Sequence, residues 1–81
     1  MEIEIYSKTN CVFCEKAKMR LQKHNPKIQM LDTDYNREDF FKKFPNARTF
    51  PQIIINGNNI GGYAELKRWL EKNSFDEDFE F

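Results

Sequence analysis

The sequence predicts an α/β domain whose elements follow the order β-α-β-α-β-β-α and form a four-stranded mixed sheet. Short apolar stretches with strand periodicity alternate with amphipathic helical patterns along the chain. A strand, a helix and a second strand in succession imply a parallel pair joined by a right-handed crossover. An Asn-Gly dipeptide at 56–57, between two further apolar stretches, predicts an antiparallel hairpin at the edge.

The first strand and helix are predicted from the N-terminal pattern. Residues 2–6 (EIEIY) alternate apolar and acidic side chains, which is the period of a strand. A helical pattern with one apolar face begins at Cys11 and ends at Asn-Pro 25–26. Thr9 or Asn10, just before it, can serve as the N-cap.

The second strand and helix follow directly. Residues 27–31 (KIQML) predict a short strand. Asn36 followed by Asp39 resembles a helix cap, and Pro45 ends the segment that they open. The helix between them has an aromatic stripe, predicted to face inward, of Phe40, Phe41 and Phe44.

The C-terminal part predicts a hairpin and a last helix. The strand at 53–55 turns at Asn-Gly, and a short strand restarts at Ile60. A diglycine then ends that strand. Residues 63–73 predict a helix whose inward positions are Leu66, Trp69 and Leu70.

Length and composition favour one small globular domain. The chain has 81 residues, 40% hydrophobic and 32% charged, without an apolar run of membrane-spanning length. Its first residues show neither a basic nor an apolar leader pattern, so we expect a cytoplasmic protein without a membrane role. We expect it to be a monomer.

Charge divides the chain into a domain at residues 1–73 and an acidic-aromatic tail at residues 74–81. All 13 Lys and Arg but only nine of the 13 Asp and Glu lie before residue 74, so the domain carries +4 and the tail −4. The basic residues are dispersed, which argues against nucleic-acid binding. A small acidic ligand suits the positive domain at least as well.

The only two cysteines, Cys11 and Cys14, allow several interpretations. A zinc site lacks ligands, since His24 is the one histidine, and no metal is expected. A crosslink closing so short a loop removes little chain entropy and does not suit a reducing compartment. Two buried cysteines acting as small apolar side chains would fit Cys14, but Cys11 lies where loop becomes helix. A redox-active pair fits both positions best.

The two thiols should have different roles. Cys11 is predicted at the positive end of a helix with Lys8 nearby, which should lower the pKa of its thiol and favour the attacking thiolate. Cys14 lies one turn further in, on the apolar face of the helix. It should be less exposed and able to resolve a mixed disulfide at Cys11.

Three separated motifs in order resemble those of the glutaredoxin family, in its short dithiol form from bacteria and their viruses. They are SKTNCVFC at 7–14, RTFPQIII at 48–55 and IGGYAEL at 60–66. The resemblance covers residues 1–73 and implies a thioredoxin-like fold, glutathione as co-substrate and a cis peptide bond before Pro51.

The resemblance also implies a glutathione site. Lys8, and less directly Arg37, would meet the glycine carboxylate, and the backbone of Phe50 would bind the cysteine part. The γ-glutamyl end would lie at the start of the last helix. The implied site comprises Lys8, Phe13, Arg37, Phe50, Pro51, Gly62, Ala64 and Glu65.

This chain departs from the usual family pattern at a few of these positions. Val12 and Phe13 replace proline and tyrosine between the cysteines, and Phe50 replaces a valine. Ala64 lacks a side-chain oxygen, and Glu65 takes the place of an aspartate that would meet the glutathione ammonium. These changes bear on affinity more than on activity.

The resemblance implies a glutathione-dependent thiol–disulfide oxidoreductase that reduces protein disulfides and glutathione mixed disulfides through Cys11 and Cys14. Disulfide-bearing proteins are the expected partners, with ribonucleotide reductase suggested by the resemblance alone. Two alternatives stay open. The protein could be a redoxin reduced by thioredoxin reductase, or an iron–sulfur cluster carrier, although an internal disulfide would compete with cluster ligation.

Overall fold

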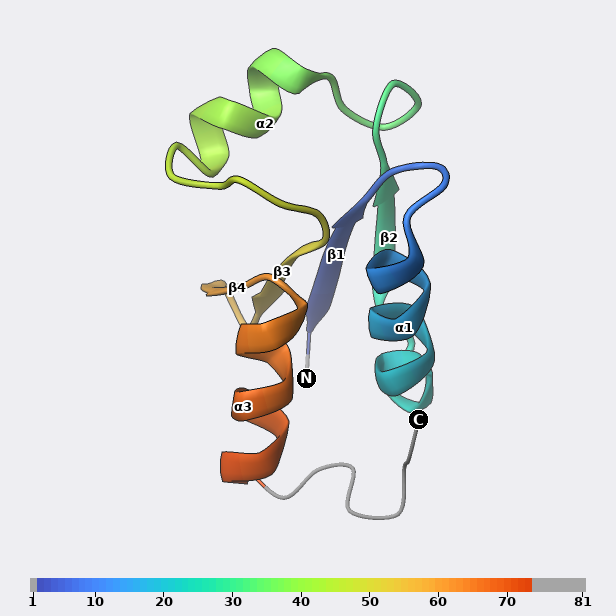
Figure 1. Cartoon of the computed structure of the whole chain (residues 1–81), viewed down its shortest axis with the longest axis vertical. Helices are drawn as coiled ribbons and strands as arrows, with labels where there is room; N and C mark the ends of the chain where they lie inside the picture. The colour runs from blue at the N-terminus through green and yellow to red at the C-terminus, as the bar shows by residue number, and fades with distance from the viewer. Residues whose placement is uncertain (1, 74–81) are drawn as a thin grey trace.

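The computed structural model describes residues 2–73 and has the predicted order of elements (Figure 1). The strands are β1 (Ile3–Ser7), β2 (Lys27–Met30), β3 (Gln52–Ile55) and β4 (Asn58–Gly61). The helices are α1 (Val12–Leu21), the 3₁₀ turn η1 (Gln22–His24), α2 (Arg37–Lys43) and α3 (Tyr63–Asn73). The predicted tail at residues 74–81 lies outside the described residues. Within the described part, no helix combines the length and apolar character needed to cross a bilayer.

The sheet is mixed, with the strand order β2-β1-β3-β4. β1 pairs in parallel with β2 and antiparallel with β3, and β3 pairs antiparallel with β4. The two central strands are therefore the ones covered on both faces. This explains why β3 (QIII) is buried at all four positions instead of alternating with polar residues.

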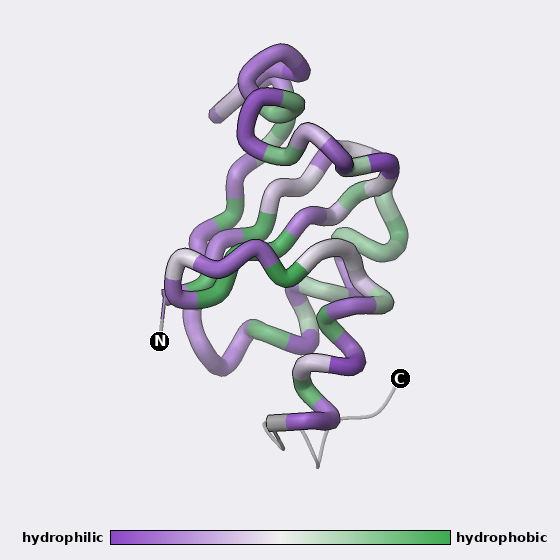
Figure 2. The backbone as a smooth tube through the Cα atoms, turned by 90° about the vertical axis from the view of Figure 1, so that its left-hand side faces the viewer, coloured by the Kyte–Doolittle hydropathy of each residue, from purple (hydrophilic) through white to green (hydrophobic). Residues whose placement is uncertain are grey.

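Each face of the sheet has its own apolar cluster. Beneath α1 and α3, which lie side by side in Figure 1, the core contains Ile3, Ile5, Ala17, Leu21, Ile53, Ile55, Leu66 and Leu70. On the α2 side, a smaller and mostly aromatic cluster contains Tyr6, Phe40, Phe44 and Ile54. Figure 2 shows the most hydrophobic stretches of the chain in its interior, where the strands lie.

The start and end of α1 differ in detail from the sequence prediction. Cys11 itself is the N-cap, in place of the expected Thr9 or Asn10, and its sulfur accepts the N–H of Cys14. The α-helix ends at Leu21 and continues only as the 3₁₀ turn η1. The predicted apolar face is confirmed, because the buried residues of α1 are Cys14, Ala17 and Leu21.

The predicted cap of α2 is confirmed, but its aromatic stripe is narrower than expected. The side chain of Asn36 accepts the N–H of Asp39 at 2.8 Å. Phe40 and Phe44 are buried, one turn apart on one face. Phe41 is 46% exposed because its direction on the short helix differs by about 100° from that of Phe40.

The hairpin between β3 and β4 is formed as predicted. Asn56 and Gly57 have φ values of 50° and 83°, the left-handed pair that a tight two-residue turn requires. In α3, Leu66 and Leu70 are buried and Trp69 packs partly buried against the same cluster. The last strand and helix are thereby fixed next to each other.

Tyr35, just before α2, generates a prediction for alkaline pH. Its hydroxyl donates to the carbonyl of Ser7 at 2.7 Å. Burial, assisted by the nearby Tyr6, raises the pKa of Tyr35 from 10.0 to about 12. Because the pKa is higher in the folded state, the protonated phenol contributes stability below pH 10, and this contribution is lost as the pH rises toward 12.

We therefore expect the difference in free energy of unfolding between wild type and Tyr35→Phe to be constant below about pH 10 and to shrink between pH 10 and 12. Urea denaturation at a series of pH values measures this difference. A difference in free energy of unfolding that stays constant up to pH 12 would contradict the raised pKa of Tyr35.

Candidate active site

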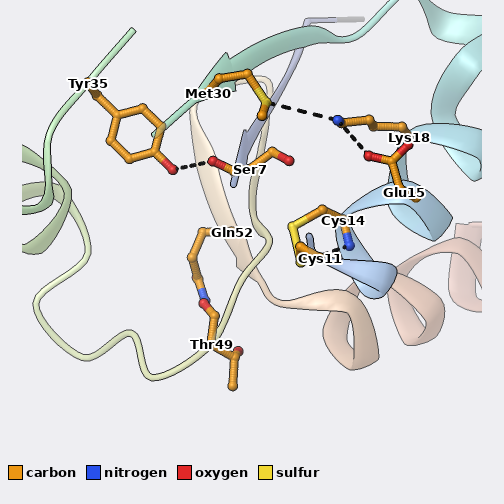
Figure 3. Close-up of a disulfide and its surroundings, with 9 residues drawn as sticks. All are labelled: Ser7, Cys11, Cys14, Glu15, Lys18, Met30, Tyr35, Thr49 and Gln52. Carbon is orange, nitrogen blue, oxygen red and sulfur yellow. Dashed lines mark hydrogen bonds and ion pairs between the residues drawn. A yellow bond between two sulfur atoms is a disulfide. The ribbon is translucent and has the colours of Figure 1, made fainter. Parts of the chain in front are cut away.

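Cys11 and Cys14 form a disulfide at the N-terminal turn of α1 (Figure 3). Their Cα atoms are 5.2 Å apart. Cys14 is completely buried, whereas Cys11 is partly exposed, as the sequence predicts. The two sulfurs therefore differ in access from solvent even though they are bonded to each other.

The helix terminus supplies electrostatic stabilisation for Cys11. The backbone N–H of Cys14 donates to the Cys11 sulfur at 3.2 Å. The free N–H groups of a helix N-terminus carry partial positive charge, so they favour a thiolate over a thiol. Between the cysteines, Val12 and Phe13 are 66% and 52% exposed, which leaves an apolar surface beside the accessible sulfur.

A groove of about 350 Å³ begins at Phe13, next to the cysteines. Three separate parts of the chain meet there: the first turn of α1, the loop before β3 and the start of α3. The lining residues are Phe13, Thr49, Phe50, Gly62, Tyr63, Ala64 and Glu65. Five of the residues predicted for a ligand site thus line one groove.

Lys8 and Phe50 are also brought together. The Lys8 ammonium lies 5.4 Å from the centre of the Phe50 ring, which is a cation–π distance. The ring of Phe50 in turn stacks on buried Phe40 of α2, with centroids 4.7 Å apart. The predicted cis peptide bond between Phe50 and Pro51 is present, and Pro51 is buried.

The diglycine and Glu65 form the N-terminal cap of α3. The carboxylate of Glu65 accepts the N–H of Gly62 at 2.9 Å and pairs with Arg68 at 3.2 Å. Gly61 has a φ of 119°, and a Cβ there would lie 2.8 Å from the Glu65 side chain. At Gly62 a Cβ would lie 3.2 Å from the Thr49 hydroxyl. The glycines therefore allow the loop before β3 to approach α3 closely.

Arg37 is placed apart from the other predicted residues. It is the first residue of α2, it is exposed, and it is not among the residues that line the groove. The family resemblance implies a role for Arg37 less directly than for the other site residues, and that role stays a prediction.

Sequence reasoning missed Tyr63 and Thr49 as groove residues. The ring of Tyr63 lies 5.5 Å from that of Phe13, and its hydroxyl accepts a hydrogen bond from Arg20 at 3.2 Å. The carbonyl of Thr49 accepts the amide of buried Gln52 at 2.9 Å, which fixes the loop before β3. An aromatic residue directly after the diglycine was the available signal for Tyr63.

The family comparison agrees with this geometry. The model of the glutaredoxin family matches residues 3–60. Glutaredoxin 3 of Escherichia coli (strain K12) is 37% identical over 67 residues, which cover 79% of this chain and 80% of that protein. Mitochondrial glutaredoxin-2 of Mus musculus is 34% identical over 71 residues, 82% of this chain but 46% of the mouse protein. The chain thus spans about half of that relative.

A solved structure gives the same picture. Glutaredoxin 1 from Francisella tularensis, crystallised with cacodylate, superposes with a TM-score of 0.74 and is 27% identical. The match covers 90% of this chain and 95% of that one. The predicted thioredoxin-like fold is therefore confirmed.

The cap of α3 gives a prediction about stability. Glu65→Ala removes the acceptor of the Gly62 N–H and should lower the free energy of unfolding by roughly 1 kcal/mol. Glu65→Gln keeps an oxygen acceptor and should lose less. Urea denaturation compares these variants with Glu71→Ala, an exposed acid at the far end of α3. Equal stability of all three variants would show that the cap contributes nothing.

Proposed function

Because the chain belongs to the glutaredoxin family of thiol–disulfide oxidoreductases, we propose that it reduces protein disulfides and glutathione mixed disulfides with electrons from glutathione. The observation that carries this proposal is the asymmetric disulfide, with Cys11 partly exposed and Cys14 buried, on either side of a groove residue, Phe13, in the sequence. Protein substrates are disulfide-bearing proteins, with ribonucleotide reductase proposed on resemblance alone.

The forward half-reaction starts from the dithiol form. The Cys11 thiolate attacks one sulfur of a substrate disulfide, and the other substrate sulfur leaves and takes up a proton. Cys14 then loses its proton and attacks the Cys11 sulfur of the mixed disulfide. The second substrate thiol departs, and two electrons have passed from the Cys11–Cys14 pair to the substrate.

Glutathione closes the cycle in two exchanges. One glutathione thiolate attacks Cys11, forms a mixed disulfide there and releases Cys14 as a thiol. A second glutathione attacks the sulfur of the bound one, and oxidised glutathione leaves. The restored Cys11 thiolate is stabilised by the N–H of Cys14.

The groove has suitable chemistry for a small peptide with carboxylates at both ends. Lys8 provides an ammonium held at the Phe50 ring, which favours one carboxylate. The N-terminal turn of α3, where Ala64 is exposed, offers partial positive charge to the other. The apolar rings of Phe13 and Tyr63 flank the middle of the groove.

The cysteine roles are tested in an assay coupled to glutathione reductase. Cys11→Ser should abolish all activity. Cys14→Ser should keep substantial activity on a glutathione mixed disulfide, since a second glutathione can complete that cycle, and lose most dithiol reduction of protein disulfides. Intact mass spectrometry of the Cys14→Ser variant should show glutathione joined to Cys11. An inactive Cys14→Ser variant with an active Cys11→Ser variant would reverse the roles.

The source of electrons is tested separately with the wild-type protein. Turnover with thioredoxin reductase as the sole electron source, and none with glutathione, would favour the alternative redoxin.

The ligand contact of Lys8 predicts a change in affinity without a change in chemistry. Lys8→Ala should raise the KM for glutathione about three- to fivefold, the size of one solvent-screened ion pair. The effect should be greater at low salt, because exposed charges are less screened there. The control is Lys72→Ala, which removes an exposed lysine from the last turn of α3, whereas the groove lies at the start of that helix.

The contact of Lys8 with the Phe50 ring can be tested in the same assay. Phe50→Val should raise the KM in the wild-type background and have little further effect once Lys8 is alanine. If Lys8→Ala and Lys72→Ala give the same KM at every salt concentration, Lys8 does not bind the ligand.

A further inference from the structure

Ser7, the last residue of β1, has a buried hydroxyl to which the proposed disulfide exchange assigns no role. Ser7 has no exposed surface, and within residues 2–73 its Oγ has no hydrogen-bond partner. Its backbone carbonyl, in contrast, accepts both the Tyr35 hydroxyl at 2.7 Å and the Leu31 N–H at 3.0 Å. A buried hydroxyl without a partner has lost its hydrogen bonds to water and gained none in return, so it calls for an explanation.

The position of Ser7 in β1 places this hydroxyl on the side of the sheet that α1 covers. Ile3 and Ile5 belong to the cluster beneath α1 and α3, while Tyr6 belongs to the cluster on the opposite face. Because side chains alternate along a strand, Ser7 shares the face of Ile3 and Ile5.

Ser7 is also level with the first turn of α1. Only residues 8–11 connect the end of β1 with the start of that helix. The buried side chain of this first turn that faces the sheet is Cys14. Figure 3 shows the Ser7 side chain turned away from Tyr35, toward the side on which Cys14 lies.

We propose that the Ser7 hydroxyl donates a hydrogen bond to the Cys14 sulfur once the disulfide is opened. In the disulfide form seen here, the Cys14 sulfur is bonded to Cys11 and the Ser7 hydroxyl makes no hydrogen bond within the described residues. A thiolate is a charged and much stronger acceptor. The hydroxyl thus gains its partner when Cys14 of the reduced protein loses its proton to become the attacking thiolate.

Ser7 acts in this proposal as a positioning residue for the resolving step. When Cys14 attacks the Cys11 sulfur of a mixed disulfide, its proton passes to solvent and the substrate thiolate leaves. Ser7 keeps its own proton throughout and stabilises the sulfur that carries the negative charge. The proposal rests on the proposed two-cysteine exchange. It does not depend on whether glutathione or another reductant supplies the electrons to the Cys11–Cys14 pair.

The redox equilibrium with dithiothreitol tests the proposal without glutathione. Under alkaline conditions in which the reduced Cys14 is a thiolate, Ser7→Ala should shift the equilibrium of the full-length protein toward the disulfide about fivefold, the size of one net hydrogen bond. Thr33→Ala, which removes an exposed hydroxyl in the turn after β2, should leave it unchanged. Alanine fits the space of serine, and the Tyr35 bond uses the Ser7 backbone, so the variant should fold.

Kinetics provide the second readout. Ser7→Ala should slow the reduction of a protein disulfide, and it should have no effect on mixed-disulfide turnover in the Cys14→Ser background. If a buried water is the partner instead, Ser7→Ala should destabilise both redox forms equally and leave the equilibrium with dithiothreitol unshifted. That result would overturn the proposal, even if the glutathione-coupled activity of the wild type were intact.

Discussion

The site depends on the packing of α1 against the central strand β1. Cys14, Ala17 and Leu21 are completely buried on the face of α1 that meets the sheet. Burial of Leu21 alone contributes about 1.5–3 kcal/mol, and the small residues Cys14 and Ala17 let the helix approach the sheet, so the rotation of the helix about its axis is fixed. With that rotation fixed, Cys14 must point inward, and the cap residue Cys11 must lie at the accessible end of the helix.

The other two parts of the groove are held by a combination of polar contacts and aromatic stacking. The loop before β3 is fixed where Gln52 bonds the Thr49 carbonyl, and Phe50 is fixed by stacking on Phe40. The start of α3 is fixed by the bond from Gly62 to Glu65. These contacts are local, so the groove can be adjusted by single substitutions while the central packing of α1 stays intact.

The sequence predicts those features that neighbouring residues determine. The hairpin turn at Asn56-Gly57 and the cap at Asn36 follow from local backbone preferences, and both are present. The exposure of Phe41 was missed because an aromatic stripe does not reveal how wide the buried face of a short helix is. Five of the seven groove residues were named only through the family motifs, because the groove joins segments far apart in the chain and no sequence period signals it. The unpaired Ser7 hydroxyl had no such signal.

The order of events in thiol–disulfide exchange also follows from the packing. A thiol that attacks a bulky disulfide must be accessible, and only Cys11 combines partial exposure with the free N–H groups of the helix terminus. The resolving thiol needs to reach one atom alone, the Cys11 sulfur, and burial keeps other disulfides away from it. Burial also disfavours a charged sulfur, so the resolving step benefits from a polar group on the buried side. Ser7, buried at the end of β1 with an unpaired hydroxyl, is a polar group of this kind.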